Sequence, residues 1–356
     1  MFNISTFWIF LLGIRPFSEF LGIPAVTFTA LITGLQVIHL FIFLEKTCGK
    51  MHKHYFFLIL LILFTAYNFA TLATVNIVIS IILLKNESLK KISLICFLSI
   101  LTALFIYLSL LSLTILKDEL IRMPKGVGHT FGFDNTNGIG AFAMQITLIT
   151  YVFIASHFRN TIPIYIFLFP NYMIYKLSLG RTPFYTIMIF FLLILIFSLF
   201  KNTLWKLKKA VTFLPILLFL CTIIACKIYE QYPILDVIFT TRFSKNSVHL
   251  DTMTPLNYLI GYKLPSGPMD SAYLDSLFAG GILSVYIFIS VSMRGISEFK
   301  FSELTKYMPF VICMLISGFT ENTFSSFSLQ TLLFYKVLCN QFPIKGIKRR
   351  YLYADI

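Results

Sequence analysis

The chain has 356 residues, of which 58% are apolar and only 12% charged, and its mean hydropathy is +0.84. Soluble domains average about 25% charged residues, whereas this chain repeats apolar runs of about 18 residues or more, each long enough to cross a membrane. The composition excludes an ordinary soluble protein and predicts an all-α polytopic membrane protein, so the net charge of +14 must be interpreted from its distribution.

Taken in chain order, eleven apolar segments predict membrane-spanning helices. They are 2–13, 24–44, 55–84, 92–116, 138–157, 161–179, 183–200, 211–228, 272–293, 307–320 and 326–341. No basic residues precede the first segment and no small-residue cleavage site follows it, so we expect it to be retained as a span. The segment 55–84 would reach about 45 Å as one helix, against a hydrocarbon core of about 30 Å. We expect about 11–12 transmembrane helices in a single integral membrane domain over 1–356.

The basic residues indicate the orientation of these spans, because cytoplasmic loops carry an excess of Lys and Arg. With two crossings in 55–84, eighteen bases and five acids fall on one side, while ten of each fall on the other. A single crossing would move the lysines of 46–53 or 85–91 to the outer side, so two crossings are favoured. The basic excess is then a topology signal, and no nucleic-acid partner is expected.

Two long loops are predicted on the extracytoplasmic side, at 117–137 and 229–271. Loops of more than about 12–15 residues are usually functional or disordered, and the aromatic residues in these two favour function. The chain has no phosphate-binding loop and no C-x-x-C, and these two loops have no D-x-D pair and no clustered histidines. We therefore expect neither a metal nor a cofactor, and a reaction that uses an already activated substrate.

Three arginines on the predicted outer side are candidate substrate-binding residues: Arg122, Arg181 and Arg242. The planar fork of a guanidinium group matches two phosphate oxygens at once, so convergence of the three would suit a lipid pyrophosphate. Simpler alternatives are a snorkelling interface arginine at Arg181 and solvated loop charges at Arg122 and Arg242. Thr182 and Pro183 are expected to cap and begin the following helix.

The candidate catalytic acids and bases are His129, Asp270 and Glu321. His129 titrates near neutral pH, but a single loop histidine is often only polar. Asp270 follows Pro268 in the expected first turn of a span, where a carboxylate also complements the helix dipole. Glu321 lies between two apolar spans, and an ionisable group at such a depth suggests function.

Asn137 and Tyr273 are further candidate substrate-binding residues. Asn137 is expected to cap a helix that starts near Gly138, and a capped helix end is also an anion site. Tyr273 lies one helical turn after Asp270, on the same face.

Three motifs, in this order, resemble those of bacterial polysaccharide polymerases of the Wzy type. They are "HTFGFDNTNGIGAF", "LSLGRTPF" and "MDSAYLDSLFAGGILSVYIF", and together with the predicted spans and the long second loop they extend the resemblance over most of the chain. The resemblance implies a GT-C-like membrane enzyme related to the O-antigen ligases. It also implies that Arg122, Arg181 and Arg242 contact pyrophosphate and glycan, with Lys125 as the alternative to Arg122 in the first loop.

The resemblance also implies an activity and a location. Such polymerases transfer a growing glycan from undecaprenyl pyrophosphate to the non-reducing end of a new lipid-linked repeat unit. They act on the outer face of the bacterial cytoplasmic membrane, with membrane lipid, a chain-length regulator and a flippase as partners, and they make O-antigen, capsule or exopolysaccharide. A ligase-like glycan transferase and a flippase for lipid-linked oligosaccharides remain the alternatives.

Overall fold

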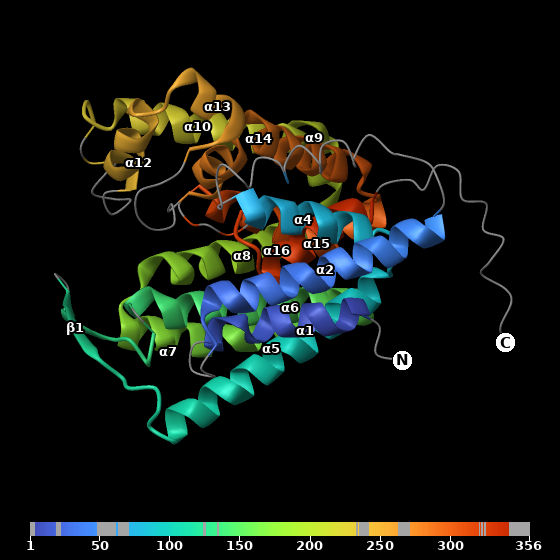
Figure 1. Cartoon of the computed structure of the whole chain (residues 1–356). Coiled ribbons are helices and arrows are strands. Elements are labelled where there is room, and N and C mark those ends of the chain that lie inside the picture. Colours follow the sequence, from blue (N-terminus) through green and yellow to red (C-terminus); the bar gives the residue numbers. More distant parts are fainter. Residues whose placement is uncertain are drawn as a thin grey trace, which may run out of the picture.

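The structure of the chain is a computed structural model, and the description below is limited to a defined set of residues. These are 4–18, 23–47, 62, 71–123, 126–133, 135–232, 234, 242–262, 271–319, 321, 323 and 325–341. They form a bundle of helices with one β-hairpin projecting from it (Figure 1). The two-stranded sheet pairs β1 with β2 in antiparallel fashion.

The helices follow the apolar segments of the sequence closely. In the first half they are α1 (Ile4–Ile14), η1 (Arg15–Phe17), α2 (Ala25–Thr47), α4 (Thr71–Leu84), α5 (Leu89–Ser112) and α6 (Thr136–His157), with β1 (Leu120–Met123) and β2 (Gly126–His129) before α6. In the second half they are η3 (Ile162–Phe167), α7 (Leu168–Ser178), α8 (Arg181–Leu199), α9 (Lys201–Thr212), α10 (Leu214–Ile228), α12 (Arg242–Asp251), α13 (Pro255–Ile260), α14 (Ala272–Glu298), α15 (Phe301–Ser317) and α16 (Leu329–Cys339).

Five of these helices are long and apolar enough to cross a membrane: α2, α5, α6, α8 and α14. A sixth span results if α9 and α10, which meet at a bend of 55°, are counted together. Shorter apolar helices, including α1, α4 and α16, pack among them. The chain is therefore an all-α, membrane-embedded polytopic protein whose one small sheet lies outside the bundle.

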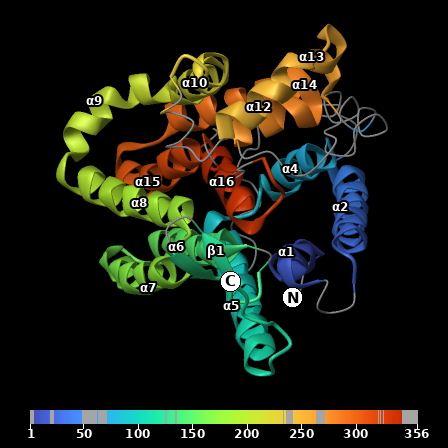
Figure 2. The same ribbon diagram turned by 90° about the vertical axis from the view of Figure 1, so that its left-hand side faces the viewer.

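The centre of the bundle is α16, which is buried along its whole length. Figure 2 shows α16 surrounded by α4, α6, α14 and α15. The helix α6 also lies deep in the bundle. Tyr151 of α6 is fully buried, and its ring meets the ring of Phe190 in α8 edge-on, with 4.9 Å between the ring centroids. Close packing of large aromatic side chains fixes these neighbours relative to one another.

The helices α2 and α4 run in the same direction, which bears on the number of crossings in 55–84. Gln36 Nε2 donates to Ser80 Oγ at 2.8 Å, and Asn76 Nδ2 donates to Thr33 Oγ1 at 3.0 Å, so later residues of one helix meet later residues of the other. The C-terminal end of α2 and the N-terminal end of α4 therefore lie at opposite ends of the bundle. This is the arrangement that two crossings require; residues 48–61 and 63–70 lie outside the described residues.

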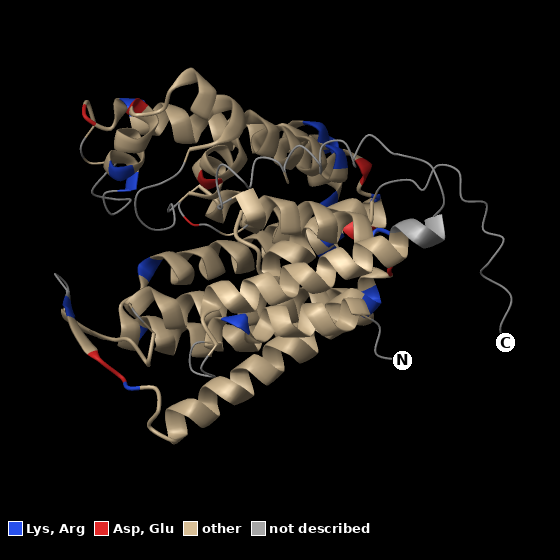
Figure 3. Cartoon of the chain, in the orientation of Figure 1, with Lys and Arg blue, Asp and Glu red and all other residues tan. Residues whose placement is uncertain are grey.

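Charged residues gather at the two ends of the bundle, with few between them (Figure 3). We call one end the hairpin end, formed by β1, β2, α12 and the N-terminal ends of α6, α8 and α14. The other is the lysine end, formed by α9 and the C-terminal ends of α4, α14 and α16. Bases predominate at the lysine end, where the acids with described side chains include Glu87, Glu298 and Glu303.

Both predicted outer loops contain regular structure. The loop 117–137 forms the hairpin β1–β2, in which Leu120 pairs with His129 and Met123 with Gly126. The loop 229–271 contains α12 and α13. The basic stretch 201–209, expected to connect two spans, is the amphipathic helix α9, which is held to α14 by Lys208 Nζ donating to the carbonyl of Phe299 at 2.9 Å.

The helix α14 is broken in the middle, at Gly280 and Gly281. Gly281 has φ +61° and ψ −158°, a conformation that only glycine adopts without strain. The backbone of α13 fills the break, because a Cβ at Gly281 would lie 2.2 Å from the carbonyl oxygen of Leu259. The carbonyls freed before the break find donors: the backbone N–H of Tyr262 bonds Phe278 O at 2.8 Å, and Thr71 Oγ1 bonds Ala279 O.

Candidate functional site

The expected site residues that the structure describes lie at the hairpin end, which faces the viewer in Figure 2. Arg122 is exposed on β1, Arg181 is the first residue of α8, and Arg242 is the first residue of α12. The three arginines therefore lie on three separate elements at the hairpin end, and each arginine has different neighbours. Their convergence in a single cavity remains a prediction.

The hairpin holds a carboxylate–imidazole pair that the sequence did not reveal. Asp118 Oδ2 lies 2.5 Å from His129 Nδ1, and Asp118 Oδ1 accepts the backbone N–H of Phe131 at 2.8 Å. Both side chains are partly exposed, at 32% for Asp118 and 37% for His129. A carboxylate on Nδ1 fixes the ring orientation and leaves Nε2 as the nitrogen that accepts a proton.

The environment of Asp118 favours its ionised form. Partial burial acts to raise the pKa of Asp118, but the hydrogen bonds from His129 and from the N–H of Phe131 outweigh it, and the pKa lies below its ordinary value. The pair is built by the hairpin, because the β1–β2 register brings residue 118 opposite 129–131. The sequence analysis missed this hairpin, although the Pro and Gly in the sequence "MPKG" at 123–126 are residues that often separate two strands.

Asn135, and not Asn137 as expected, caps the N-terminus of α6. The expected start of this helix near Gly138 is therefore also wrong. Asn135 Oδ1 accepts the N–H of Asn137 at 2.9 Å, and the helix begins at Thr136. An N-cap acceptor reaches a backbone N–H two or three residues later, so Asn137 supplies the donor and its side chain is left for another contact. That side chain lies against Gly180, where a Cβ would be 3.0 Å from Asn137 Oδ1.

The contact at Gly180 brings the starts of α6 and α8 together. Gly180, and not Thr182, is the N-cap residue of α8, so the helix begins at Arg181 and not at Pro183 as expected. The preceding Leu179 has φ +58°, which ends α7 in a tight turn. Gly140 of α6 and Pro183 of α8 are also in close contact, since a Cβ at Gly140 would lie 3.2 Å from the Pro183 ring.

Arg181 is half-buried beside this contact, next to the first backbone N–H groups of α8. It makes no hydrogen bond or ion pair with any residue that the structure describes. Its guanidinium group is therefore available to an anion, and the N-terminus of a helix favours negative charge at the same place.

Arg242 and Glu321, assigned different roles from the sequence, are direct partners. Arg242 Nη2 donates to Glu321 Oε1 at 2.8 Å, and the arginine is only 8% exposed while the glutamate side chain is 27% exposed. A charge-assisted bond of this kind, mostly shielded from water, holds both groups firmly. It joins α12 to the connection between α15 and α16.

That connection also holds the first turn of α14. The carbonyl of Glu321 accepts the N–H of Ala272 at 3.1 Å, and the carbonyl of Gly318 accepts the same N–H at 2.9 Å. Tyr273 is buried in this turn, and its hydroxyl donates to the carbonyl of Leu315 at 2.9 Å. Tyr273 therefore packs between α14 and α15, while Asp270 lies outside the described residues.

The connection between α15 and α16 is polar and buried. Thr323 is 2% exposed; its hydroxyl accepts from Ser317 Oγ at 3.2 Å, and its carbonyl accepts from Thr331 Oγ1 at 2.9 Å. Arg15, after α1, donates to the carbonyl of Phe327 at 2.9 Å. Non-helical backbone in a membrane-embedded bundle needs such partners, and Arg15 supplies one of them.

The hairpin end thus contains three groups of candidate residues. The first is the Asp118–His129 pair, the second is Asn137 and Arg181 at the adjoining starts of α6 and α8, and the third is Arg242, Glu321 and the first turn of α14. Among the described residues no three of His, Cys, Asp or Glu lie together in a way that would hold a metal ion. The first group can accept a proton, and the second can bind an anion.

Comparisons with known proteins do not assign the chain to a family. No family model, no curated protein and no solved structure matches it. The function is therefore argued from the residues at the hairpin end and from the motifs that contain them.

Proposed function

We propose that the chain is a polysaccharide repeat-unit polymerase that works at the hairpin end, on the outer face of the bacterial cytoplasmic membrane. The observation that carries this proposal is the imidazole of His129, oriented by Asp118 at the same end of the bundle as Arg181 and Arg242. The motif resemblance points to the same activity. The proposal includes a GT-C-like arrangement of about 11–12 spans in a single membrane domain.

In the proposed reaction a sugar hydroxyl of the incoming repeat unit attacks the anomeric carbon of the donor chain. The new C–O bond forms as the bond to the pyrophosphate breaks, and its electron pair leaves with undecaprenyl pyrophosphate. The hydroxyl proton passes to His129 Nε2. Asp118, bonded to Nδ1, stabilises the imidazolium that results.

Charge that builds on the departing pyrophosphate needs cationic partners. Arg181 meets this need, because it has no partner among the described residues and lies at a helix N-terminus. Arg242 is held by Glu321, so it is a fixed positive group rather than a mobile one. Glu321 is then a positioning residue for Arg242, and Asp118 has the same role for His129.

The test is chain growth from a purified lipid-linked repeat unit by the full-length protein in membranes. Arg181→Ala should lower the rate by about 10²–10³-fold, as loss of a group that stabilises transition-state charge does, and should leave mainly single repeat units. Lys176→Ala is the matched control, because it removes an exposed positive charge from the same end. Full-length polymer from a correctly inserted Arg181→Ala protein would refute the pyrophosphate contact.

A flippase for lipid-linked oligosaccharides is the second candidate, favoured by the break in α14 at Gly280 and Gly281. Discontinuous helices are typical of transporters. A flippase would move the lipid-linked unit across a vesicle membrane without lengthening it, whereas a polymerase lengthens a unit that is already outside. A ligase-like transferase would consume finished glycan and require a separate acceptor.

A further inference from the structure

The helix α9 is basic along its length, and none of its residues is fully buried. Its sequence, "KNTLWKLKKAVT", contains four lysines and no acidic residue. It meets α10 at a bend of 55°, and Figure 2 shows it at the edge of the bundle, between α8 and α10. A lysine-rich amphipathic helix in this place is the type of element that lies at a membrane surface.

One face of α9 packs against the protein. Leu204 and Val211 contact the hydrophobic core of the bundle. The ring of Trp205 meets the ring of Phe301, the first residue of α15, edge-on, with 5.5 Å between the ring centroids. Lys208 Nζ lies 4.5 Å from the centroid of the Trp205 ring. These contacts fix how α9 is rotated about its axis, and so they determine which of its side chains point outward.

The other face of α9 is exposed and has a basic edge and an apolar edge. Lys206 and Lys209 are exposed, and because they are three residues apart, they lie side by side on the helix surface. Leu207, which is half-exposed, is turned by about 100° from Lys206. The helix therefore presents ammonium groups and a hydrocarbon side chain to the same surroundings, a combination that suits the boundary between lipid headgroups and acyl chains.

Exposed apolar side chains continue from both ends of α9. Leu199 and Phe200 precede it at the end of α8, and Phe213 and Leu217 follow it at the start of α10. Each of the four is more than half exposed, and α8 is long and apolar enough to cross a membrane. Large exposed apolar side chains in such a position mark a contact with lipid. The helix α9 therefore joins two stretches that face hydrocarbon.

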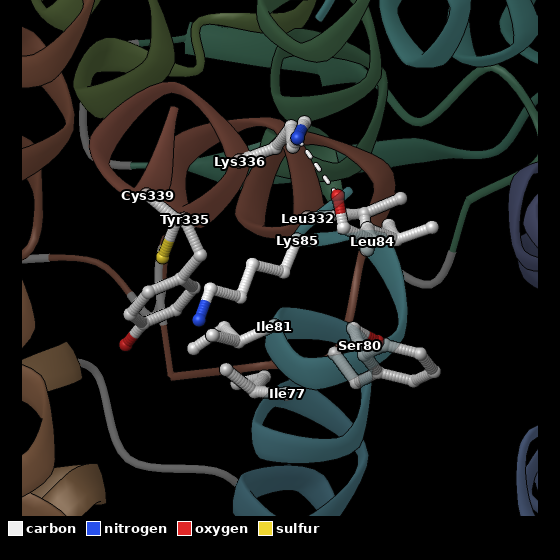
Figure 4. A pocket seen from close by; sticks show the side chains of 10 residues that line it. Ile77, Ser80, Ile81, Leu84, Lys85, Leu332, Tyr335, Lys336 and Cys339 are labelled. Atoms are coloured by element: carbon white, nitrogen blue, oxygen red, sulfur yellow. Dashed lines mark hydrogen bonds between the residues drawn. The ribbon is translucent and has the colours of Figure 1, made fainter. Parts of the chain in front are cut away.

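Not every lysine at this end of the molecule is available to lipid. Lys336 in α16 is only 4% exposed, and its Nζ donates to the carbonyl of Leu84 at 2.7 Å inside a narrow crevice between α4 and α16 (Figure 4). The two exposed lysines of α9 differ, because their stems start at the surface. A lysine stem can lie along apolar side chains while its ammonium group reaches the headgroup region.

The exposed lysines of α9 have no carboxylate partner in the part of the chain that the structure describes. Glu298, the last residue of α14, acts electrostatically on Lys208, which belongs to the packed face. Neither Glu298 nor Glu303, in the first turn of α15, forms an ion pair with Lys206 or Lys209 among these residues. The outer edge of α9 therefore keeps an excess of positive charge, which is complementary to the phosphate groups of anionic lipids.

We propose that α9 lies in the headgroup region of the leaflet at the lysine end and binds anionic phospholipids there. Lys206 and Lys209 contact the phosphate groups, and Leu207 enters the upper part of the acyl chains. Trp205, which is partly exposed, lies at the level where tryptophan is enriched in membrane proteins. This surface is separate from the hairpin end, so it does not depend on the proposed enzymatic activity.

Tryptophan fluorescence of the full-length protein in lipid nanodiscs tests the proposal. The chain has two tryptophans; Trp8 is fully buried, and subtracting the emission of the Trp205→Phe variant leaves the signal of Trp205. The nanodiscs contain phosphatidylcholine and a minor fraction of a lipid with brominated acyl chains, which quench tryptophan at short range. Brominated phosphatidylglycerol should quench Trp205 about twofold or more compared with the same fraction of brominated phosphatidylcholine, because lysines concentrate anionic lipid around α9.

Two double variants separate α9 from the rest of the lysine end. Lys206→Gln with Lys209→Gln removes both exposed charges and should make the two brominated lipids quench Trp205 equally. Lys85→Gln with Lys90→Gln is the matched control, because it removes two exposed lysines from the same end, and it should keep the preference for phosphatidylglycerol. Raising the salt concentration should weaken the preference in the unaltered protein, since salt screens exposed charges.

Equal quenching by the two lipids in the unaltered protein would overturn the proposal, as would an unchanged preference after the loss of Lys206 and Lys209. Strong quenching of Trp205 by aqueous iodide, without quenching by either lipid, would place α9 in water and would also overturn it. If the double variant at α9 does not fold, the salt series decides, and a preference that does not change with salt would exclude a contact between lysine and phosphate.

Discussion

At the scale of single residues, the candidate chemistry depends on partners distant in the sequence. His129 becomes a plausible base because Asp118 holds Nδ1, and Arg242 is fixed because Glu321, 79 residues later, accepts its hydrogen bond. Without these partners each residue is an ordinary polar group of a loop. The Asp118 carboxylate therefore leaves Nε2 of His129 as the ring nitrogen for a substrate, and the Glu321 carboxylate holds Arg242 in place.

Asp118→Asn should reduce glycan transfer while leaving the fold intact, because an amide cannot stabilise the imidazolium of His129 as a carboxylate does. The expected loss is within the roughly 10²–10⁴-fold range of general-base effects. Glu119→Gln is the control: it neutralises the neighbouring exposed acid and should retain activity. Rates are compared over a range of pH, and an unchanged pH profile in Asp118→Asn would remove Asp118 from the mechanism.

The stability of the hairpin should also depend on pH through Asp118. Its pKa is lowered in the folded hairpin, so the ionised form stabilises the fold above the ordinary pKa of about 3.9. This contribution is lost as the pH falls through the lowered folded-state pKa. Because the pair is partly exposed, the effect is small, at about 1 kcal/mol or less. Hydrogen exchange at the N–H of Phe131 would measure it, and Asp118→Asn should show no such dependence.

At the scale of elements, the sequence predicted the spans much better than the connections between them. Apolar runs bounded by charged residues determine where helices such as α6 and α8 begin and end, to within a few residues. The break in α14 was not predicted, because its cause is the backbone of α13, which fills the space at Gly281. The hairpin and the Asp118–His129 pair were also missed, since they depend on register rather than on composition.

The break in α14 gives a prediction about stability. Gly281→Ala should destabilise the protein by about 1–3 kcal/mol, because alanine is strained at φ +61°, and its Cβ would overlap the Leu259 carbonyl. Gly34→Ala is the matched control in α2, where a Cβ meets no atom within 4 Å. That change should be neutral or stabilise by about 0.5–1 kcal/mol. Thermal unfolding in detergent compares the two, and an equal effect of both would show that the break tolerates a side chain.

At the scale of the whole molecule, the distribution of charge separates two ends with different expected environments. The proposed polymerase site lies at the hairpin end, and the lysine end lies at the opposite end of the bundle (Figures 1 and 3). The excess of bases at the lysine end predicts that it faces the cytoplasm. The enzyme proposal depends on this orientation, because a lipid-linked repeat unit that has been flipped is reached only from the outside.

Cysteine labelling tests the orientation directly. Val127→Cys places a thiol on β2, where the native side chain is 53% exposed, and Lys90→Cys places one on an exposed position at the lysine end. Both are made in a chain without native cysteines, since Cys221 is itself exposed. A membrane-impermeant maleimide added to intact cells should label position 127 and should label position 90 only after the membrane is permeabilised. The reverse pattern would place Arg181 and His129 on the cytoplasmic side, where the proposed substrate of the polymerase is absent, and would exclude that function.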